Sequence, residues 1–244
     1  MNDYKELADE YEILNPREDI YKQKNFFKEI IEKYHIKSCL DCACGLGWHL
    51  EMINELGVKC YGSDISEEMI NICEENLKGE DIVLKVGDFR DLDSCWERKF
   101  DIIICVTSAL NHMQDDEEII KALKSMRERL SDNGVLIIAS GVSDALIINK
   151  PKLIPAKLYS DKAVYFFLEY FDDKVTFNIF NIRKTQDSFE HSLNTMTLSL
   201  ISRERFEKCS SKAGFRNGDV YGDFELNEYV KDSINHRFIV LLRK

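Results

Sequence analysis

Residues 39–50 read Cys-Leu-Asp-Cys-Ala-Cys-Gly-Leu-Gly-Trp-His-Leu and join a short apolar strand pattern to an amphipathic helix pattern. Gly45 and Gly47 let the chain turn sharply and bring its backbone close to a ligand, because no Cβ stands in the way. Leu50 occupies the place of the third glycine in a dinucleotide-binding fingerprint, and Asp41 precedes the loop. The stretch therefore predicts a strand–loop–helix unit that binds a nucleotide-like ligand without the full dinucleotide fingerprint.

Strand and helix patterns alternate on both sides of this stretch. Strands are expected at 38–42, 58–62, 82–86, 100–106 and 135–139, and helices at 19–34, 48–56, 66–77, 115–130 and 203–213. Two more strands, at 216–222 and 235–242, would complete the sheet. This order predicts an α/β fold with a doubly wound, mostly parallel, seven-stranded Rossmann-like sheet that binds ligands at the carboxyl ends of its strands.

The pattern changes after residue 150. Strand-like runs at 164–171, 175–182 and 192–200 are separated by polar turns, which is typical of antiparallel strands. We therefore expect a single domain over residues 1–244. It would have N-terminal lid helices (1–35), a core (36–148 and 201–244) and an antiparallel β insertion (149–200) that serves as a substrate lid.

Composition excludes several classes of protein. The 33 basic and 44 acidic residues give a formal charge of −11, with no basic run, so a nucleic acid partner is not expected. No apolar run is long enough to span a membrane, and the amino terminus has no signal-peptide core, so a cytoplasmic protein is expected. The chain would be a monomer or a homo-oligomer. No metal site is expected, because a second Cys-x-x-Cys pair is missing and strand alternation would point Cys39 away from Cys42 and Cys44.

Two more acidic residues follow successive strands. Asp64 ends the second strand pattern, where it can accept hydrogen bonds from ribose hydroxyls, and Asp88 follows the third, where it can accept from an adenine amino group while Phe89 lies against the ring. S-adenosylmethionine fits this set better than a dinucleotide, because it has no pyrophosphate and its ammonium group can be met by Asp41 and Ala43. A nucleotide-dependent oxidoreductase remains the lesser alternative.

The successive motifs resemble those of the class I S-adenosylmethionine-dependent methyltransferases. The resemblance rests on the glycine loop, Asp64-Ile65-Ser66, Asp88, Ile104-Cys105 and the 131–134 turn. More narrowly, the chain resembles the glycine and glycine/sarcosine N-methyltransferases, through the antiparallel insertion, Asn111-His112-Met113 and Gly222-Asp223-Phe224. The resemblance implies methyl transfer from S-adenosylmethionine, with S-adenosylhomocysteine as product, to a small-molecule acceptor, most readily an amine.

The resemblance also implies roles for named side chains. Arg17 and Tyr21 look like the family's arginine–tyrosine pair, whose arginine holds the methionine carboxylate of the cofactor, and Tyr11 lies near the family's tyrosine beside the transferred methyl group. The full expected cofactor set is Arg17, Tyr21, Asp41, Ala43, Gly45, Gly47, Trp48, Asp64, Ile65, Met69, Asp88, Phe89 and Val106.

His112 is the other catalytic candidate besides Tyr11. It follows the fourth strand, where the acceptor would approach, and its ordinary pKa suits a weak base or an orienting donor, although a purely structural histidine fits the pattern equally well. An acceptor that reacts through oxygen, carbon or sulfur, and a non-catalytic protein that binds S-adenosylmethionine, also remain open.

One departure from the glycine-type enzymes concerns the acceptor. Their arginine that grips the substrate carboxylate after the fifth strand is replaced here by Gly141. Either a basic residue of the insertion supplies that contact, or the acceptor is not an amino acid. The candidate basic residues are Lys150, Lys152, Lys157 and Arg183.

Overall fold

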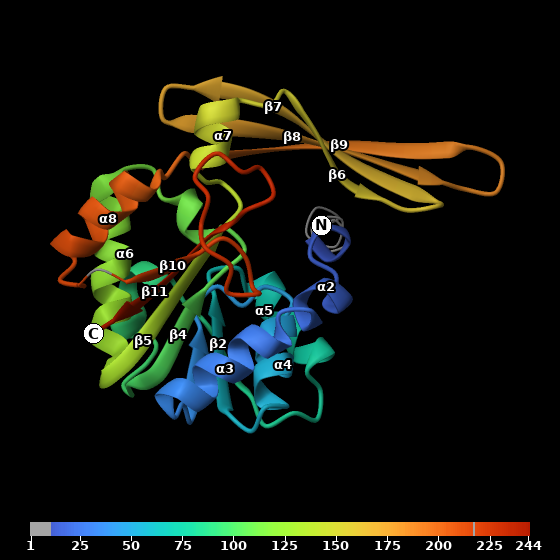
Figure 1. Ribbon diagram of the computed structural model, residues 1–244. Coiled ribbons are helices and arrows are strands. Elements are labelled where there is room, and N and C mark those ends of the chain that lie inside the picture. The colour runs from blue at the N-terminus through green and yellow to red at the C-terminus, as the bar shows by residue number, and fades with distance from the viewer. Residues whose placement is uncertain (1–10, 217) are drawn as a thin grey trace.

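Five neighbouring parallel strands make up most of a seven-stranded sheet in the computed structural model, which describes residues 11–216 and 218–244 (Figure 1). They are β1 (Ser38–Asp41), β2 (Lys59–Asp64), β3 (Val83–Val86), β4 (Phe100–Cys105) and β5 (Leu130–Ser140). β11 (Phe238–Arg243) runs antiparallel to β5, and β10 (Asp219–Tyr221) runs antiparallel to β11. The order β10-β11-β5-β4-β1-β2-β3 confirms the predicted α/β fold.

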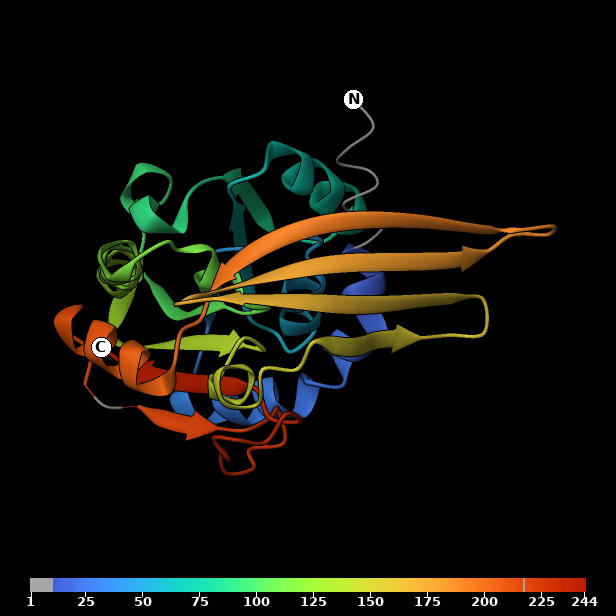
Figure 2. The same ribbon diagram turned by 90° about the horizontal axis from the view of Figure 1, so that it is seen from above.

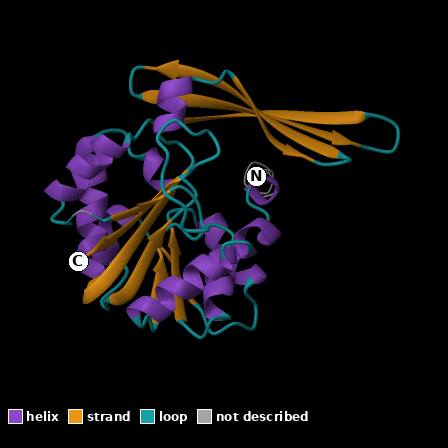
Figure 3. Cartoon of the chain, in the orientation of Figure 1, coloured by secondary structure: helices purple, strands orange, loops and turns teal. Residues whose placement is uncertain are grey.

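Helices cover both faces of this sheet (Figure 3). α3 (Lys24–Tyr34), α4 (Trp48–Asn54) and α5 (Glu67–Asn76) pack on one face, and α6 (Asp116–Arg129) and α8 (Arg203–Lys212) pack on the other. Alternation along β4 supplies both cores, since Ile102 and Ile104 face the first group while Ile103 and Cys105 face the second. A strand buried on both faces must be apolar throughout, which explains its continuous run of isoleucines.

A second, four-stranded antiparallel sheet lies above the edge where the parallel strands end, and its far half projects beyond the core (Figures 1 and 2). It contains β6 (Leu153–Leu158), β7 (Lys162–Phe171), β8 (Lys174–Lys184) and β9 (Phe189–Ser199), in that order. Near the core, Val164, Leu168 and Val175 bury one face of this sheet against α7 (Asp144–Asn149).

Three elements differ from the sequence expectation. The helix expected at 19–34 is divided into α2 (Arg17–Tyr21) and α3, and Gln23 at the break makes a 3.1 Å hydrogen bond to Nε2 of His49. α7 and β6 follow β5 where no element was expected. Pro155 is accommodated in β6 because an edge strand tolerates a residue without an N–H group. Of the expected N-terminal lid, residues 1–10 lie outside the described residues.

The cysteine cluster also differs from expectation. Cys39 and Cys44 lie in the core under α3, α4 and α5, whereas Cys42 lies in the core on the opposite face. Strand alternation ends at Asp41, and the Cys44 N–H turns back to the carbonyl of Ser63 at 3.0 Å, so alternation does not predict the direction of Cys44. No helix in the described part of the chain is long and apolar enough to cross a lipid bilayer.

Candidate functional site

The glycine loop after β1 has the backbone shape that the sequence predicts. Gly45 and Gly47 have φ angles of +50° and +89°, and Gly47 caps the amino end of α4. A Cβ on Gly47 would lie 2.6 Å from Sγ of Cys73 on α5. A side chain at position 47 is therefore excluded twice, by the left-handed backbone and by the close approach of α5.

Asp64 connects this loop to the next helix. Its Oδ2 accepts a hydrogen bond from the Gly45 N–H, and its Oδ1 accepts one from the Ser66 N–H, both at 3.0 Å. A carboxylate offers about four lone-pair sites, so both oxygens can accept further bonds. The carboxylate is thus fixed at the carboxyl end of β2 with free acceptor capacity, which fits a ribose diol.

Asp41 is buried at the end of β1, and its Oδ1 accepts a 3.2 Å hydrogen bond from the Ala43 N–H. Burial raises the pKa of Asp41 to about 7, the bond from Ala43 opposes this, and the charge of Asp64 adds to it. A cationic ligand at the loop would favour the ionised form of this carboxyl group. Asp41 and the neighbouring Ala43 therefore fit the ammonium group of S-adenosylmethionine.

Asp88 has a different environment. Both of its oxygens accept bonds from the side chain of Arg90, at 2.7–3.1 Å, and Arg90 also contacts Glu118. Burial raises the pKa of Asp88, but the bonds from Arg90 outweigh this effect and hold it below its ordinary value. Phe89 begins the short helix η1 (Phe89–Ser94) and packs against the core. An adenine amino group would compete with Arg90 for the Asp88 oxygens.

Tyr11 lies over the glycine loop. Its ring is 3.3 Å from the position of a Cβ on Gly45, and its hydroxyl is 2.9 Å from Oγ1 of Thr107, just after β4. Burial raises the pKa of Tyr11 to about 12, although the hydrogen bond to Thr107 opposes it, so the phenol stays protonated at neutral pH. Thr107 and Ser108 both have left-handed φ angles, which is uncommon outside glycine and marks a constrained turn at this edge.

Arg17 and Tyr21 lie on α2 and face the surface of α4. Arg17 Nε donates to Glu51 at 2.6 Å, and its guanidinium is 4.3 Å from the centre of the Tyr21 ring. The Tyr21 hydroxyl donates to Glu55 at 2.7 Å. The contact with Glu51 raises the pKa of Arg17. The structure therefore brings the pair together but engages both side chains with α4, and the carboxylate role of Arg17 stays a prediction.

His112 ends the short helix η2 (Ala109–His112) and is exposed. Protein around the ring lowers its pKa, while the charge of Asp64 acts in the opposite direction, so the ring is neutral at pH 7. Its neighbour Asn111 is buried and has a structural role, because its amide donates at 2.8 Å to the carbonyl of Ser199 at the end of β9.

The remaining expected cofactor residues differ in how far they are buried. Met69 is buried against Leu46 and packs with Tyr11 and Trp48, whose Nε1 donates to Glu12 at 2.8 Å. Ile65 is 66% exposed. Val106 is buried and lines a cavity described next.

A small polar cavity lies beside Thr107, between the ends of the strands and the second sheet. It has a volume of about 50 Å³, several times the 10–15 Å³ that one water molecule needs. The charged side chains that line it are Asp19, Lys157 and Arg237. The other lining residues are Leu14, Asn15, Ile20, Gln23, His49, Val106, Thr107 and Phe224.

Arg237 was missed by the sequence analysis. It directly precedes β11 and lies far along the chain from Thr107 and the glycine loop, and no motif around it points to a ligand. The signal that the sequence does carry is indirect: Gly222-Asp223-Phe224 was noted as a motif, and the Gly222 carbonyl accepts a 2.7 Å hydrogen bond from the Arg237 N–H.

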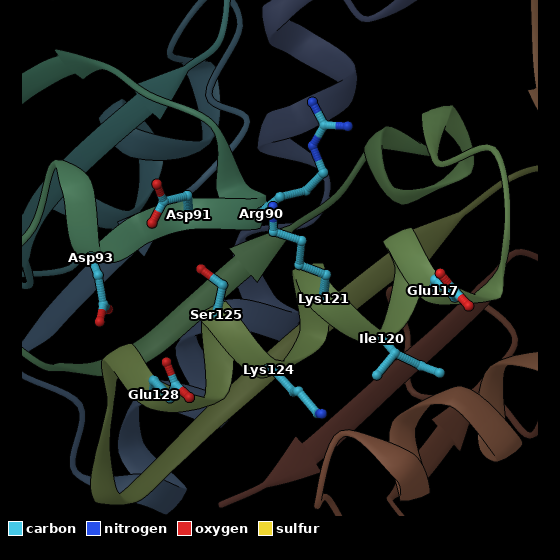
Figure 4. Close-up of a pocket in the computed structure, with 9 residues that line it drawn as sticks. All are labelled: Arg90, Asp91, Asp93, Glu117, Ile120, Lys121, Lys124, Ser125 and Glu128. Atoms are coloured by element: carbon cyan, nitrogen blue, oxygen red, sulfur yellow. The ribbon is translucent and has the colours of Figure 1, made fainter.

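A second hollow lies between η1 and α6, away from the glycine loop (Figure 4). Both basic and acidic side chains line it, and they point in different directions rather than toward one centre. Arg90 lines this hollow and also binds Asp88, but the hollow has no group that converges on a ligand, so the candidate site is the glycine loop with the cavity beside Thr107.

Comparison with known proteins agrees with this geometry. A model described as "Methyltransferase domain" matches residues 39–134. A glycine/sarcosine N-methyltransferase of Aphanothece halophytica is 24% identical over 223 residues, which cover 91% of this chain and 82% of the relative. A dTDP-3-amino-3,4,6-trideoxy-alpha-D-glucopyranose N,N-dimethyltransferase of Streptomyces venezuelae is 33% identical over 101 residues, or 41% of each chain.

Solved structures show the same fold. An S-adenosylmethionine-dependent methyltransferase from Clostridium acetobutylicum ATCC 824 superposes with a TM-score of 0.82 over 98% of both chains, at 21% identity. The matched methyltransferase domain extends from β1 to Gly134 within β5 and so includes the glycine loop, Asp64 and Asp88. The matched methyltransferase domain, the similarity along most of the chain and the shared fold together support a class I S-adenosylmethionine-dependent methyltransferase.

Proposed function

We propose that this enzyme transfers a methyl group from S-adenosylmethionine to the amine nitrogen of a small molecule. The observation that carries the proposal is similarity over 91% of the chain to an enzyme that methylates glycine and sarcosine, together with a preserved glycine loop. The 33% identical sugar dimethyltransferase also acts on an amine. The acidic net charge of −11 favours a small acceptor over a nucleic acid.

The proposed cofactor residues bind rather than react. Bound S-adenosylmethionine supplies an activated methyl group on a positively charged sulfur. Asp64 would accept from the ribose, and Asp41 with the Ala43 carbonyl would meet the ammonium group, because each is already fixed by backbone hydrogen bonds. Positioning and electrostatics, not a covalent step on the protein, are what this transfer needs from the chain.

The proposed acceptor residues orient the nitrogen and exclude water. The Tyr11 hydroxyl stays protonated, so it would act as a hydrogen-bond partner and not as a base. His112 is neutral, so it can accept a proton from an incoming ammonium group or order the acceptor. The antiparallel sheet above this edge would serve as the lid that keeps water out (Figure 1).

Calorimetry with S-adenosylmethionine and S-adenosylhomocysteine tests the cofactor half of the proposal. Asp64→Ala should weaken binding about 100-fold, because hydrogen bonds to a charged group contribute roughly 1.5–3 kcal/mol each. Asp132→Ala is the matched control, since that side chain is 94% exposed and lies at the opposite end of the sheet. Unchanged binding by Asp64→Ala would contradict the assignment.

Mass spectrometry of a panel of small amines, alcohols and thiols tests the acceptor half. We expect a mass increase of one or more methyl groups on amines alone, dependent on S-adenosylmethionine. Methylation of an alcohol or a thiol in preference to every amine would replace the proposal by one of the alternatives.

A further inference from the structure

The guanidinium of Arg237 lies next to the position from which a side chain at residue 141 would extend. An ideal Cβ on Gly141 would lie 3.7 Å from Nη1 of Arg237 and 3.9 Å from Oγ of Ser108. Gly141 follows β5 directly, at the carboxyl edge of the parallel strands. A cation from a distant part of the chain thus stands at the end of β5, next to the constrained turn after β4.

This cation has no partner within residues 11–216 and 218–244. Among the described residues, no hydrogen bond or ion pair reaches the Arg237 guanidinium. Asp19 is the acidic residue in the cavity, but its two oxygens already pair with Lys22 and Lys157. Surrounding protein lowers the pKa of Arg237, and the charge of Asp19 only partly offsets this. Arg237 is exposed, so a ligand that enters the cavity can reach a guanidinium that no hydrogen bond or ion pair of the described residues engages, and a carboxylate would form a charge-assisted hydrogen bond there.

The segment that carries Arg237 is held in place before β11 begins. The Arg237 N–H donates to the Gly222 carbonyl at 2.7 Å, and Nδ1 of His236 accepts a 3.0 Å hydrogen bond from the Val230 N–H. A Cβ on Gly222 would lie 2.4 Å from Nδ1 of His236, so only glycine allows this packing. The backbone that carries Arg237 is therefore held by hydrogen bonds and close packing, and this supports a binding group.

The charge of the cavity is also unbalanced. Lys157 and Asp19 cancel each other, and burial together with the charge of Arg237 lowers the pKa of His49 to about 3, so that ring is neutral. One positive charge remains, and it belongs to Arg237. Thr107 lines the same cavity and bonds to Tyr11 over the glycine loop, so the cavity adjoins the expected position of the methyl group.

We propose that Arg237 forms an anion subsite for the methyl acceptor, and that the acceptor is a small amine that also carries a carboxylate. The planar guanidinium matches a carboxylate in bidentate geometry, and the cavity volume of about 50 Å³ suits a group of that size. The carboxylate would bind Arg237 while the amine lies toward Thr107 and Tyr11. This specificity deepens the proposed function and rests on it.

Acceptor pairs that differ only in the carboxylate test the subsite. Glycine is compared with methylamine, and β-alanine with ethylamine, in methyl transfer by the wild-type enzyme and by Arg237→Met. The wild type should prefer the carboxylated member of at least one pair by about 30-fold or more, and Arg237→Met should lose that preference. Arg243→Met is the control, because Arg243 is exposed at the far end of β11, and it should keep the preference.

A binding measurement separates this inference from the proposed function. Ligand-observed NMR with glycine and with acetate, in the presence of S-adenosylhomocysteine, should show binding to the wild type that Arg237→Met abolishes. If carboxylates bind through Arg237 but no amine is methylated, the subsite stands and the proposed function fails. If amines are methylated without regard to the carboxylate, in the wild type and in Arg237→Met alike, the subsite is overturned.

Two further measurements distinguish a subsite from a structural arginine. Arg237→Met should fold, bind S-adenosylmethionine as the wild type does, and melt at the same or a higher temperature, because it removes an unpaired charge. Adding Gly141→Arg to Arg237→Met should restore part of the carboxylate preference, since both positions direct a side chain to the same space. A lower melting temperature without any change in acceptor preference would contradict the proposal.

Discussion

The two halves of the site, at the ends of β1 and β2 and at the ends of β4, β5 and β11, are built in opposite ways. At the first, Asp41 and Asp64 are held by backbone N–H groups of the loop that follows each strand. At the second, Arg237 comes from a remote segment and has no partner in the described structure. In the proposed site, the carboxylates of the first half are already held by the backbone, whereas the second half presents an exposed guanidinium that the described residues leave unpaired.

The largest expected effect concerns the buried acid of the first half. The pKa of Asp41 is raised to about 7 in the fold and has an ordinary value of 3.8 when unfolded, so the native state holds a proton that the unfolded chain releases. Stability from this group is full below about pH 4 and falls as pH rises to about 7, by about 4 kcal/mol in total. Asp41→Asn should remove this slope.

Denaturant unfolding of the ligand-free protein at several pH values measures this pH dependence of the free energy of unfolding. Between about pH 5.5 and pH 8 the wild type should lose about 2 kcal/mol relative to Asp41→Asn. His49 titrates in the opposite sense, because its lowered pKa of about 3 makes stability fall as pH decreases below about 6.5. The wild type and Asp41→Asn share the contribution of His49, so it cancels in the difference between them. Parallel pH profiles of the two proteins would therefore show that the fold does not raise the pKa of Asp41.

The backbone of the glycine loop gives the next largest effect. Gly47→Ala should cost about 3 kcal/mol, because its Cβ meets Cys73 and the residue keeps a left-handed φ of +89°. Gly57→Ala is the matched control: its φ is +83°, but nothing lies within 4 Å of the new Cβ, so only the backbone strain of about 1 kcal/mol remains. Equal losses in the two variants would show that packing against α5 contributes nothing.

The same contrast explains which parts were predictable from sequence. Asp41, Gly45 and Asp64 each stand next to a strand pattern, and a parallel sheet brings the ends of its strands to one edge. The local strand pattern, together with the rule that parallel strands end at one edge, is therefore enough to predict where these three residues lie. The fold class followed for the same reason, since alternating strand and helix patterns admit few arrangements.

Side-chain partners could not be predicted in this way. Three ion pairs at or near the site have no signal in the sequence. They join Arg90 to Asp88, Arg17 to Glu51, and Lys157 to Asp19. Arg237 lies 96 residues from Gly141, and only the antiparallel pairing of β11 with β5 brings them together. That strand pairs out of chain order, so the acceptor half depends on tertiary structure throughout.

Gly222→Ala should disturb the acceptor half and leave the cofactor half intact. The new Cβ would lie 2.4 Å from the His236 ring, which must move and take the adjoining Arg237 backbone with it. We expect a loss of about 2 kcal/mol in stability, from overpacking, and weaker discrimination between acceptors. Affinity for S-adenosylmethionine, measured by calorimetry, should stay within about twofold, because the glycine loop and Asp64 do not contact this segment. A parallel loss of cofactor affinity would mean that the two halves are coupled.

Tyr11→Phe tests a side-chain hydrogen bond that joins the two halves, and it has the smallest expected effect. The variant keeps the ring over Gly45 and removes only the 2.9 Å hydrogen bond to Thr107. The free energy of unfolding should fall by about 1 kcal/mol, the usual net contribution of such a bond. Thr107→Val removes the same hydrogen bond by changing its partner in the half of the site that would bind the methyl acceptor. If the bond links the halves, each variant should reduce methyl transfer while cofactor affinity holds, and the double variant should lose no more than either single one. Additive losses would instead mean that Tyr11 and Thr107 act separately, each on its own half of the site.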